Sequence, residues 1–166
     1  ALVRSGVGLL TLVDFDDVCV TNTNRQLHAM RDTVGQPKVE VMAERARRIN
    51  PHVQVQTREL FYSEETADSL LPSAEGIDFI VDAIDNITAK CHLLNRCREL
   101  ELPVVSSMGA AARLDPTKLR VADLRETYND PFARDVRGIL RRKYEWNLDE
   151  PTNVLAVFTT ERPHKP

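Results

Sequence analysis

The stretch DFDDVCVTNTNRQ (residues 14–26) follows directly after an apolar run and gathers side chains that suit a nucleotide. The carboxylate of Asp14 can bind a ribose, and the guanidinium of Arg25 presents a fixed fork of donors that matches phosphate oxygens. The stretch also has a structural explanation, because acids at strand ends often form turns and Asn22 and Asn24 favour turns by bonding their own backbone. A solvated loop and a nucleotide site are both compatible with this composition.

Two further stretches carry residues of the same kind. GQPK (35–38) places Lys38 in the first turn of a predicted helix, where a cation is unfavourable unless an anionic ligand lies beside it. FIVDAIDN (79–86) ends an apolar run with Asp82 and Asp85, of which one can cap the next helix and the other can hold Mg²⁺ beside a triphosphate. The ordered set of these motifs, rather than any one of them, indicates a nucleotide site.

Apolar strands alternate with amphipathic helices along the chain. Strands are predicted at 9–14, 52–60, 78–85, 103–109, 119–124 and 154–160, and helices at 37–50, 63–72, 86–100 and 130–146. The alternation predicts an α/β, Rossmann-like fold with a largely parallel sheet and helices on both faces. Ligands of such sheets bind at the carboxyl ends of the strands, where Asp14, Asp85 and Gly109 are expected to lie.

The start of the chain lacks a part that this fold requires. A dinucleotide-type unit begins with a strand and a glycine-rich turn, about 20 residues before the acid that binds the ribose. Counting back from Asp14 passes the first residue, and ALVRSGVG (1–8) then corresponds to the end of the first helix, with Gly6 after it. We therefore predict a single domain over 1–166, truncated at its N-terminal side, whose first strand and glycine-rich loop lie upstream.

The composition, 42% hydrophobic and 28% charged, is that of an ordinary globular protein. A net charge of −3 excludes a general attraction to nucleic acid, so any such role needs a local patch. No apolar run reaches the roughly 20 residues of a membrane span. The cysteines Cys19, Cys91 and Cys97 form no CxxC pair, which indicates reduced thiols and a cytoplasmic protein. Cys91 and Cys97 are expected to be buried in a helix.

The stretches LTLVDFDDVCVTNTNRQ, TVGQPKVEVMAERARRINP and FIVDAIDN resemble the ThiF/MoeB superfamily of ATP-dependent adenylating enzymes, which are related to ubiquitin activators. The resemblance runs from about residue 2 to 125 and implies a ThiF-type ATP-binding domain that uses ATP and Mg²⁺. It implies attack of a substrate carboxylate on the α-phosphate, a reaction that depends on positioning and charge neutralisation. By the resemblance Asp85 holds the metal, Arg25, Lys38 and Asp85 are catalytic, and the nucleotide contacts are Asp14, Asn22, Asn24, Arg25, Lys38, Asp85 and Asn86.

The later part of the chain resembles one branch of this superfamily. Members that activate ubiquitin-like carriers usually hold zinc in paired CxxC motifs, but no cysteine follows SSMGAAARLDP (106–116), so we expect no zinc. The pattern MGAAARLDPTKLRVADL…T…DPFARDVR is similar to the tRNA threonylcarbamoyladenosine dehydratases, and DDVCVTN fits them too. These activate a carboxylate on tRNA and close it to a ring with an internal nucleophile, so that no enzyme thiol is required. Cys19 is either a reactive thiol or, by preference, a packed one. The family also implies a homodimer.

The predicted helix at 130–146 is rich in basic residues. Over 130–143 it carries two acids and five cations, namely Arg134, Arg137, Arg141, Arg142 and Lys143. Clustered Lys and Arg suit RNA phosphates, and a solvated helix face is the equal alternative.

The leading prediction is an ATP-dependent enzyme that cyclises N6-threonylcarbamoyladenosine in tRNA by dehydration. One alternative is adenylation of a sulfur-carrier protein's C-terminal glycine, with a sulfur-carrier or cysteine-desulfurase system as partner; the absence of CxxC pairs counts against it. The other is a non-catalytic partner subunit, against which the retention of Asp14, Arg25, Lys38 and Asp85 counts. A plain NAD-binding domain leaves NTNRQ and GQPK unexplained.

Overall fold

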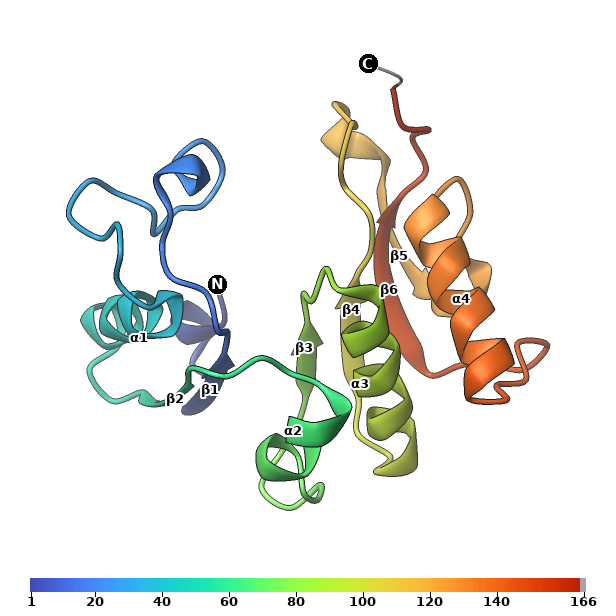
Figure 1. Cartoon of the computed structure of the whole chain (residues 1–166), viewed down its shortest axis with the longest axis horizontal. Helices are drawn as coiled ribbons and strands as arrows, with labels where there is room; N and C mark the ends of the chain where they lie inside the picture. The colour runs from blue at the N-terminus through green and yellow to red at the C-terminus, as the bar shows by residue number, and fades with distance from the viewer. Residues whose placement is uncertain (165–166) are drawn as a thin grey trace. The chain divides into compact units, whose positions relative to one another are not determined.

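The computed structural model describes residues 1–164, so the last two residues of the predicted domain lie outside the described part. The chain folds into two compact units, Ala1–Tyr62 and Ser63–Pro166 (Figure 1). Both combine helices with strands that pair mainly in parallel, which confirms the predicted α/β class. The single domain over 1–166 stays a prediction.

The first unit is a βαβ arrangement. It contains η1 (Leu2–Ser5), β1 (Leu9–Val13), η2 (Val20–Asn22), α1 (Lys38–Ile49) and β2 (Gln54–Arg58). The two strands pair in parallel, from Leu9 beside Gln54 to Val13 beside Arg58. The helix begins after Pro37, whose fixed φ suits a helix start, and it buries Ala46 against Val3 and Val53.

The long loop between β1 and α1 folds back on itself. Asp17 forms an isolated antiparallel bridge with Pro37, and the backbone N–H of Val18 donates to Gln36 O at 2.8 Å. A small core of Val18, Ala29 and Val41 lies beneath it. The loop therefore brings the acid-rich stretch (14–26) and GQPK (35–38) together, although eight residues lie between them.

The second unit holds a four-stranded sheet in the order β3-β4-β6-β5. Its elements are α2 (Glu64–Leu70), β3 (Ile80–Asp82), α3 (Ile87–Glu99), β4 (Val104–Ser107), η3 (Pro116–Lys118), β5 (Leu119–Asp123), η4 (Leu124–Glu126), α4 (Pro131–Lys143) and β6 (Val154–Thr159). The first three strands of this order are parallel, and β5 joins β6 antiparallel.

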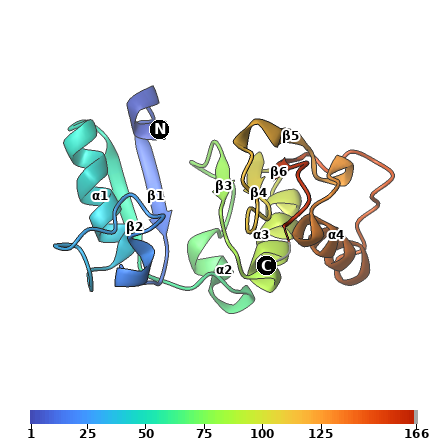
Figure 2. The same ribbon diagram turned by 90° about the horizontal axis from the view of Figure 1, so that it is seen from above.

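The two faces of this sheet differ. In Figure 2, α2, α3 and α4 lie on the same side of the strands. Successive side chains of a strand point to opposite faces of the sheet. The side chains on the face towards the helices, among them Val104, Ala156 and Phe158, are buried. On the other face Val81 and Leu155 are exposed. Within the described residues no helix is long and apolar enough to cross a bilayer.

Candidate functional site

The carboxylate of Asp14 lies at the carboxyl end of β1, as predicted. Its Oδ1 accepts a hydrogen bond from the backbone N–H of Asp16 at 2.9 Å, so one oxygen turns the chain out of the strand. The backbone N–H of Asp14 donates to Arg58 O at 3.2 Å, which continues the pairing with β2. Oδ2 makes no hydrogen bond to any described residue and is left for a ligand hydroxyl. The turn-forming role and a ribose contact are thus compatible.

The ammonium group of Lys38 contacts an acid that the sequence analysis did not single out. Lys38 Nζ lies 2.5 Å from Asp16 Oδ2, and the backbone N–H of Lys38 donates to Asp16 O at 3.0 Å. The cation in the first turn of α1 is therefore already compensated by Asp16, so it does not by itself require an anionic ligand. Asp16 is half exposed, with 47% of its side chain accessible. The Lys38 side chain is only 11% accessible, so a phosphate can compete for it only from the side where Asp16 meets solvent.

The two asparagines of the acid-rich stretch shape the loop around Arg25. Asn22 is buried, and its Oδ1 accepts from the backbone N–H of Cys19 at 3.0 Å. Arg25 is exposed, and its Nη1 donates to Thr21 O and to Asn24 Oδ1, both at 2.9 Å. The asparagines thus have the turn-forming contacts that their residue type favours. The Nη2 and Nε donors of Arg25 make no bond among residues 1–164, so they are able to bind an anion.

Two buried polar atoms of the same loop lack a partner. Gln26 Oε1 and His28 Nε2 are two of the three such side-chain atoms in the described chain. Burial lowers the pKa of His28, and the charge of Lys38 lowers it further, whereas Asp14 raises it. His28 is therefore neutral at pH 7, and sequence reasoning missed it. Buried polar atoms in folded proteins nearly always have a partner, so these two atoms indicate a place for a ligand or water.

The three cysteines have different environments. Cys91 and Cys97 are buried in α3 as predicted, and burial raises the pKa of their thiols to about 11 and about 12. The preference for a packed Cys19 was wrong, because Cys19 is exposed. The hydroxyl of Thr21 donates to Cys19 Sγ at 3.1 Å, which lowers the pKa of that thiol by favouring the thiolate.

At the end of β3, in the second unit, Asp82 is part of a buried polar cluster. Its Oδ2 lies 2.6 Å from Lys90 Nζ and accepts from Ser106 Oγ at 2.5 Å, while Lys90 Nζ also donates to Ser106 Oγ at 3.1 Å. Its Oδ1 accepts from the backbone N–H of Ile84 at 2.9 Å and turns the chain into the DAID loop. The cluster thus fixes the loop that carries Asp85.

Sequence reasoning missed Lys90 and Ser106, although a signal exists. Lys90 is spaced at helical intervals from Leu94 and Cys97 and is fully buried with them on α3. A buried lysine on the apolar face of a helix needs an acidic partner. Asp82, at the end of the preceding apolar run, was the available candidate.

The expectation that Asp82 or Asp85 caps α3 was wrong. The cap is Asn86, whose Oδ1 accepts from the backbone N–H groups of Thr88 at 3.1 Å and Ala89 at 3.0 Å. Asp85 is exposed and makes no hydrogen bond or ion pair within the described chain. The described residues contain no group of three or more His, Cys, Asp or Glu that is able to hold a metal ion. Asp85 suits Mg²⁺ only in the way common for this ion, as one carboxylate beside phosphate oxygens and waters.

The predicted nucleotide contacts divide between the units. Asp14, Asn22, Asn24, Arg25 and Lys38 belong to the first unit, and Asp85 and Asn86 belong to the second.

The two stretches that suggested a branch of the superfamily meet at one aspartate. Asp130 caps α4 by accepting from the backbone N–H of Ala133 at 3.1 Å, and its other oxygen accepts from Gly109 N–H at 3.1 Å. Arg113 Nη2 lies 3.9 Å from Asp130 Oδ1. A Cβ at Gly109 would lie 3.0 Å from Asp130 Oδ1, so a side chain here would crowd the capping carboxylate. SSMGAAARLDP and DPFARDVR therefore form one structural unit.

The five basic side chains of α4 are not equivalent. Arg137 turns inward: its Nη1 donates to Thr127 O at 2.8 Å and to Thr127 Oγ1, and burial lowers its pKa. It fastens the loop before α4, which gives it a structural role, and its RNA contact stays a prediction.

The remaining four cations face solvent. Arg134 pairs with Asp135 at 3.1 Å, and Lys143 lies 3.7 Å from Glu64. Arg141 and Arg142 are exposed and have no hydrogen bond or ion pair with any residue from 1 to 164. These two are the uncommitted cations of the helix.

Comparison with known proteins covers almost the whole chain. The profile of the ThiF family matches residues 1–154. The tRNA threonylcarbamoyladenosine dehydratase of Bacillus subtilis is 48% identical over 163 residues, which are 98% of this chain and 61% of the relative. The molybdopterin-synthase adenylyltransferase of Salmonella typhimurium is 37% identical over 80% of this chain and 50% of that protein. The chain thus spans about three fifths of the length of the dehydratase it matches.

Solved structures give the same picture for the fold. The Escherichia coli tRNA N6-threonylcarbamoyladenosine dehydratase in complex with ATP matches with a TM-score of 0.93 and 41% identity, over 99% of this chain and 68% of that one. Its complex with AMP matches with a TM-score of 0.93.

Proposed function

Because this chain belongs to the ThiF family, we propose that it is the ATP-dependent adenylating part of a tRNA threonylcarbamoyladenosine dehydratase. The observation that carries the proposal is the likeness of nearly the whole chain to a dehydratase solved with ATP. The chemistry of the exposed groups agrees with it: Arg25 has free guanidinium donors, and Lys38 has a replaceable partner.

In the first step, an oxygen of the substrate carboxylate attacks the α-phosphorus of ATP and pyrophosphate leaves, so that an acyl-adenylate forms. Asp14 Oδ2 accepts a ribose hydroxyl, and Arg25 and Lys38 neutralise charge on the phosphates. Charge neutralisation by positioned groups is commonly the largest single contribution to such a transfer. Mg²⁺, held by Asp85, supplies further charge neutralisation when it is bound.

In the second step, a nucleophile within the threonylcarbamoyl group attacks the activated carbonyl and AMP leaves. The substrate has then closed a ring and lost one water in total, while ATP has become AMP and pyrophosphate. No enzyme thiol takes part, so the exposed Cys19 has no required role in this scheme.

The proposal extends to the oligomeric state, the partners and the cellular location. We propose that the chain belongs to a single ATP-binding domain with a glycine-rich loop upstream, acts as a homodimer and works on tRNA in the cytoplasm. Carrier-protein adenylation is the second candidate, because a molybdopterin-synthase adenylyltransferase is 37% identical over part of the chain. A sulfur-carrier or cysteine-desulfurase system would be the partner in that case.

The test is ATP-dependent loss of one water from threonylcarbamoyladenosine in purified tRNA, read by mass spectrometry after digestion. The full-length protein is compared with Arg25→Ala and with the matched control Arg48→Ala, an exposed arginine on α1. We expect water loss that requires ATP and falls about 100-fold or more in Arg25→Ala, as when a group that stabilises the transition state is removed. Arg48→Ala is expected to keep the wild-type rate.

Unchanged tRNA with ATP present would overturn the dehydratase proposal. Pyrophosphate release only on addition of a sulfur-carrier protein would favour the second candidate.

A further inference from the structure

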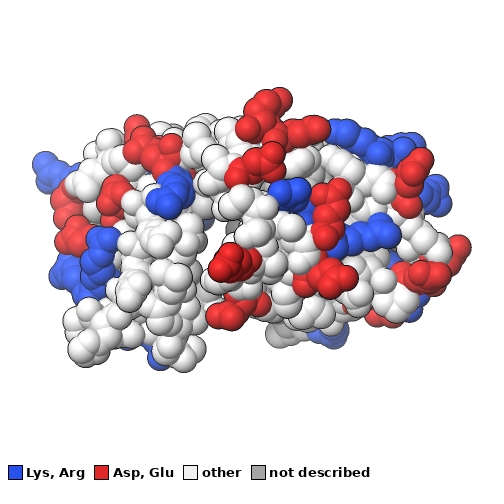
Figure 3. All heavy atoms as spheres, turned by 90° about the horizontal axis from the view of Figure 1, so that it is seen from below, with Lys and Arg blue, Asp and Glu red and all other residues white. Residues whose placement is uncertain are grey.

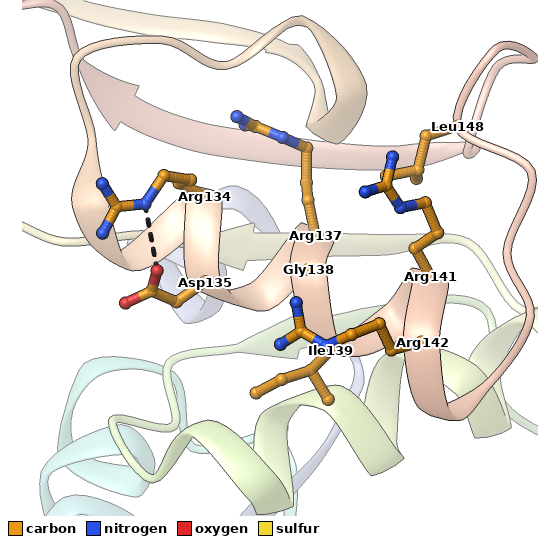
Figure 4. A pocket seen from close by; sticks show the side chains of 8 residues that line it. All are labelled: Arg134, Asp135, Arg137, Gly138, Ile139, Arg141, Arg142 and Leu148. Carbon is orange, nitrogen blue, oxygen red and sulfur yellow. Dashed lines mark hydrogen bonds and ion pairs between the residues drawn. The ribbon is translucent and has the colours of Figure 1, made fainter.

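A hollow of about 400 Å³ lies on the solvent side of α4. Its floor is Gly138, its walls include Arg134, Arg141 and Arg142, and Leu148 stands at its rim (Figure 4). Positions 134, 138, 141 and 142 share one face because they are spaced at whole helical turns. The hollow therefore follows from arginines placed around one residue without a side chain; a fourth arginine of the lining, Arg137, is engaged with Thr127.

Gly138 is a costly choice at this position. It lies in the interior of a 13-residue helix, where glycine is less favourable than any other residue except proline. It is not among the glycines with positive φ, so the backbone does not require it. A Cβ here would lie 3.2 Å from Arg142 Nη1, tighter than nine in ten such contacts, so the guanidinium would have to shift by a few tenths of an ångström. Glycine thus makes room for the Arg142 side chain to lie across the helix.

The charges around the hollow are mostly uncompensated. Arg141 and Arg142 have no partner among the described residues, as shown above. The one acid in the lining is Asp135, and it is already engaged with Arg134. In Figure 3, Lys and Arg in the second unit lie mainly towards its right-hand end, with acids between them. The positive field is therefore local, which suits a defined anion rather than a broad electrostatic surface.

We propose that this hollow binds a backbone phosphate of the tRNA substrate, held by the guanidinium groups of Arg141 and Arg142. The proposal rests on the proposed function for the identity of the RNA. Guanidinium forks match phosphate oxygens, and clustered cations release counterions from RNA. A membrane surface fits less well, because none of the large exposed hydrophobic side chains of the described chain lies on α4.

The first experiment measures the affinity for unmodified and threonylcarbamoylated tRNA at several salt concentrations. It compares wild type, Arg141→Ala/Arg142→Ala and Arg48→Ala, with circular dichroism and Tm as checks of folding. We expect the double variant to bind tRNA at least 10-fold more weakly and to reduce the magnitude of the slope of log affinity against log salt by about one, since one phosphate contact is lost. Arg48→Ala should match wild type.

The second experiment uses Gly138→Ala. Alanine favours the helix, so we expect Tm to rise by about 2–4 °C, while the Cβ displaces Arg142 and tRNA affinity falls several-fold. If Gly138 is only structural, Gly138→Ala would lower Tm or leave the tRNA affinity unchanged, and either result would contradict the proposal.

The outcomes separate the two proposals. If wild type dehydrates the tRNA but the double variant binds it with unchanged affinity and salt slope, the hollow is not a phosphate site and the dehydratase proposal stands. If the double variant loses tRNA affinity and wild type shows no dehydration, the phosphate site stands and the reaction is wrong. Inorganic phosphate is also tested as a competitor of tRNA binding. If it displaces tRNA as effectively as unlabelled tRNA does at the same concentration of phosphate groups, the hollow is a simple anion site and the RNA assignment is wrong.

Discussion

Two lysine–aspartate pairs of almost equal length lie in opposite surroundings. Lys38 and Asp16, at the end of β1, are 2.5 Å apart, and the aspartate is 47% exposed. Lys90 and Asp82, at the end of β3, are 2.6 Å apart, and both side chains are fully buried. Distance alone would assign them the same role, whereas burial assigns them different ones.

A pair whose carboxylate reaches solvent can exchange that partner, and a fully buried pair cannot. The Lys38 side chain is only 11% accessible, but Asp16 is half exposed, so a phosphate can replace the carboxylate from the solvent side. Lys90 has left water completely, so removal of its partner would strand a charge in the interior. We expect the first pair to serve phosphate binding, whereas the second holds the DAID loop in place.

The largest expected effect comes from breaking the buried pair. Lys90→Met leaves the Asp82 carboxylate without its cation, and we expect the free energy of unfolding to fall by about 3–5 kcal/mol. Urea denaturation followed by circular dichroism measures this change. Lys90→Met/Asp82→Asn removes the stranded charge as well and should recover much of the loss. A loss below 1 kcal/mol for the single variant would contradict the structural role.

The Lys38–Asp16 pair, whose carboxylate reaches solvent, should behave differently. We expect Lys38→Met to lower the free energy of unfolding by less than Lys90→Met does, yet to slow ATP-dependent dehydration about 100-fold by removing a cation from the phosphates. Parallel urea titrations and single-turnover assays give both numbers. Asp16→Asn is the matched variant, because it frees Lys38 without removing it. A Lys38→Met enzyme with full activity would leave the pair without a binding role.

The thiols extend the contrast between the two regions. At pH 8 we expect Cys19 to react with iodoacetamide at least about 100-fold faster than Cys91, because a thiol pKa of about 11 leaves about 100-fold less thiolate than the ordinary 9.0. The lowered pKa of Cys19 and its exposure act in the same direction. Peptide mass spectrometry of briefly labelled native protein measures the ratio, and Cys19→Ser should abolish the fast labelling. Equal labelling of the cysteines would show that α3 opens readily.

Much of the architecture follows from sequence periodicity. The helices predicted at 37–50 and 86–100 are observed at Lys38–Ile49 and Ile87–Glu99, because capping residues and apolar spacing act locally. The strand predicted at 78–85 ends at Asp82, since the carboxylate of that residue bonds the N–H of Ile84 and turns the chain. The antiparallel direction of β5 did not follow from its sequence, because pairing direction depends on the connections.

The candidate site was predictable in its residue types but not in its partners. Asp14 and Arg25 lie on the loop where the motif placed them. Lys38 was expected to need an external anion, yet Asp16, 22 residues earlier, supplies one. Two adjacent aspartates precede the loop, and only the folded backbone determines which of them reaches the lysine.

The order of strands in the second unit also affects how the protein is made. β6 lies between β4 and β5, although it follows both of them in the chain. Translation adds about 5–20 residues per second. After β5 has been synthesised, several seconds therefore pass before β6, which pairs with both β4 and β5, is available. During that interval the nascent chain shows open strand edges, the kind of surface that chaperones protect from aggregation. Folding of this unit during translation is therefore completed only once Thr159 has emerged.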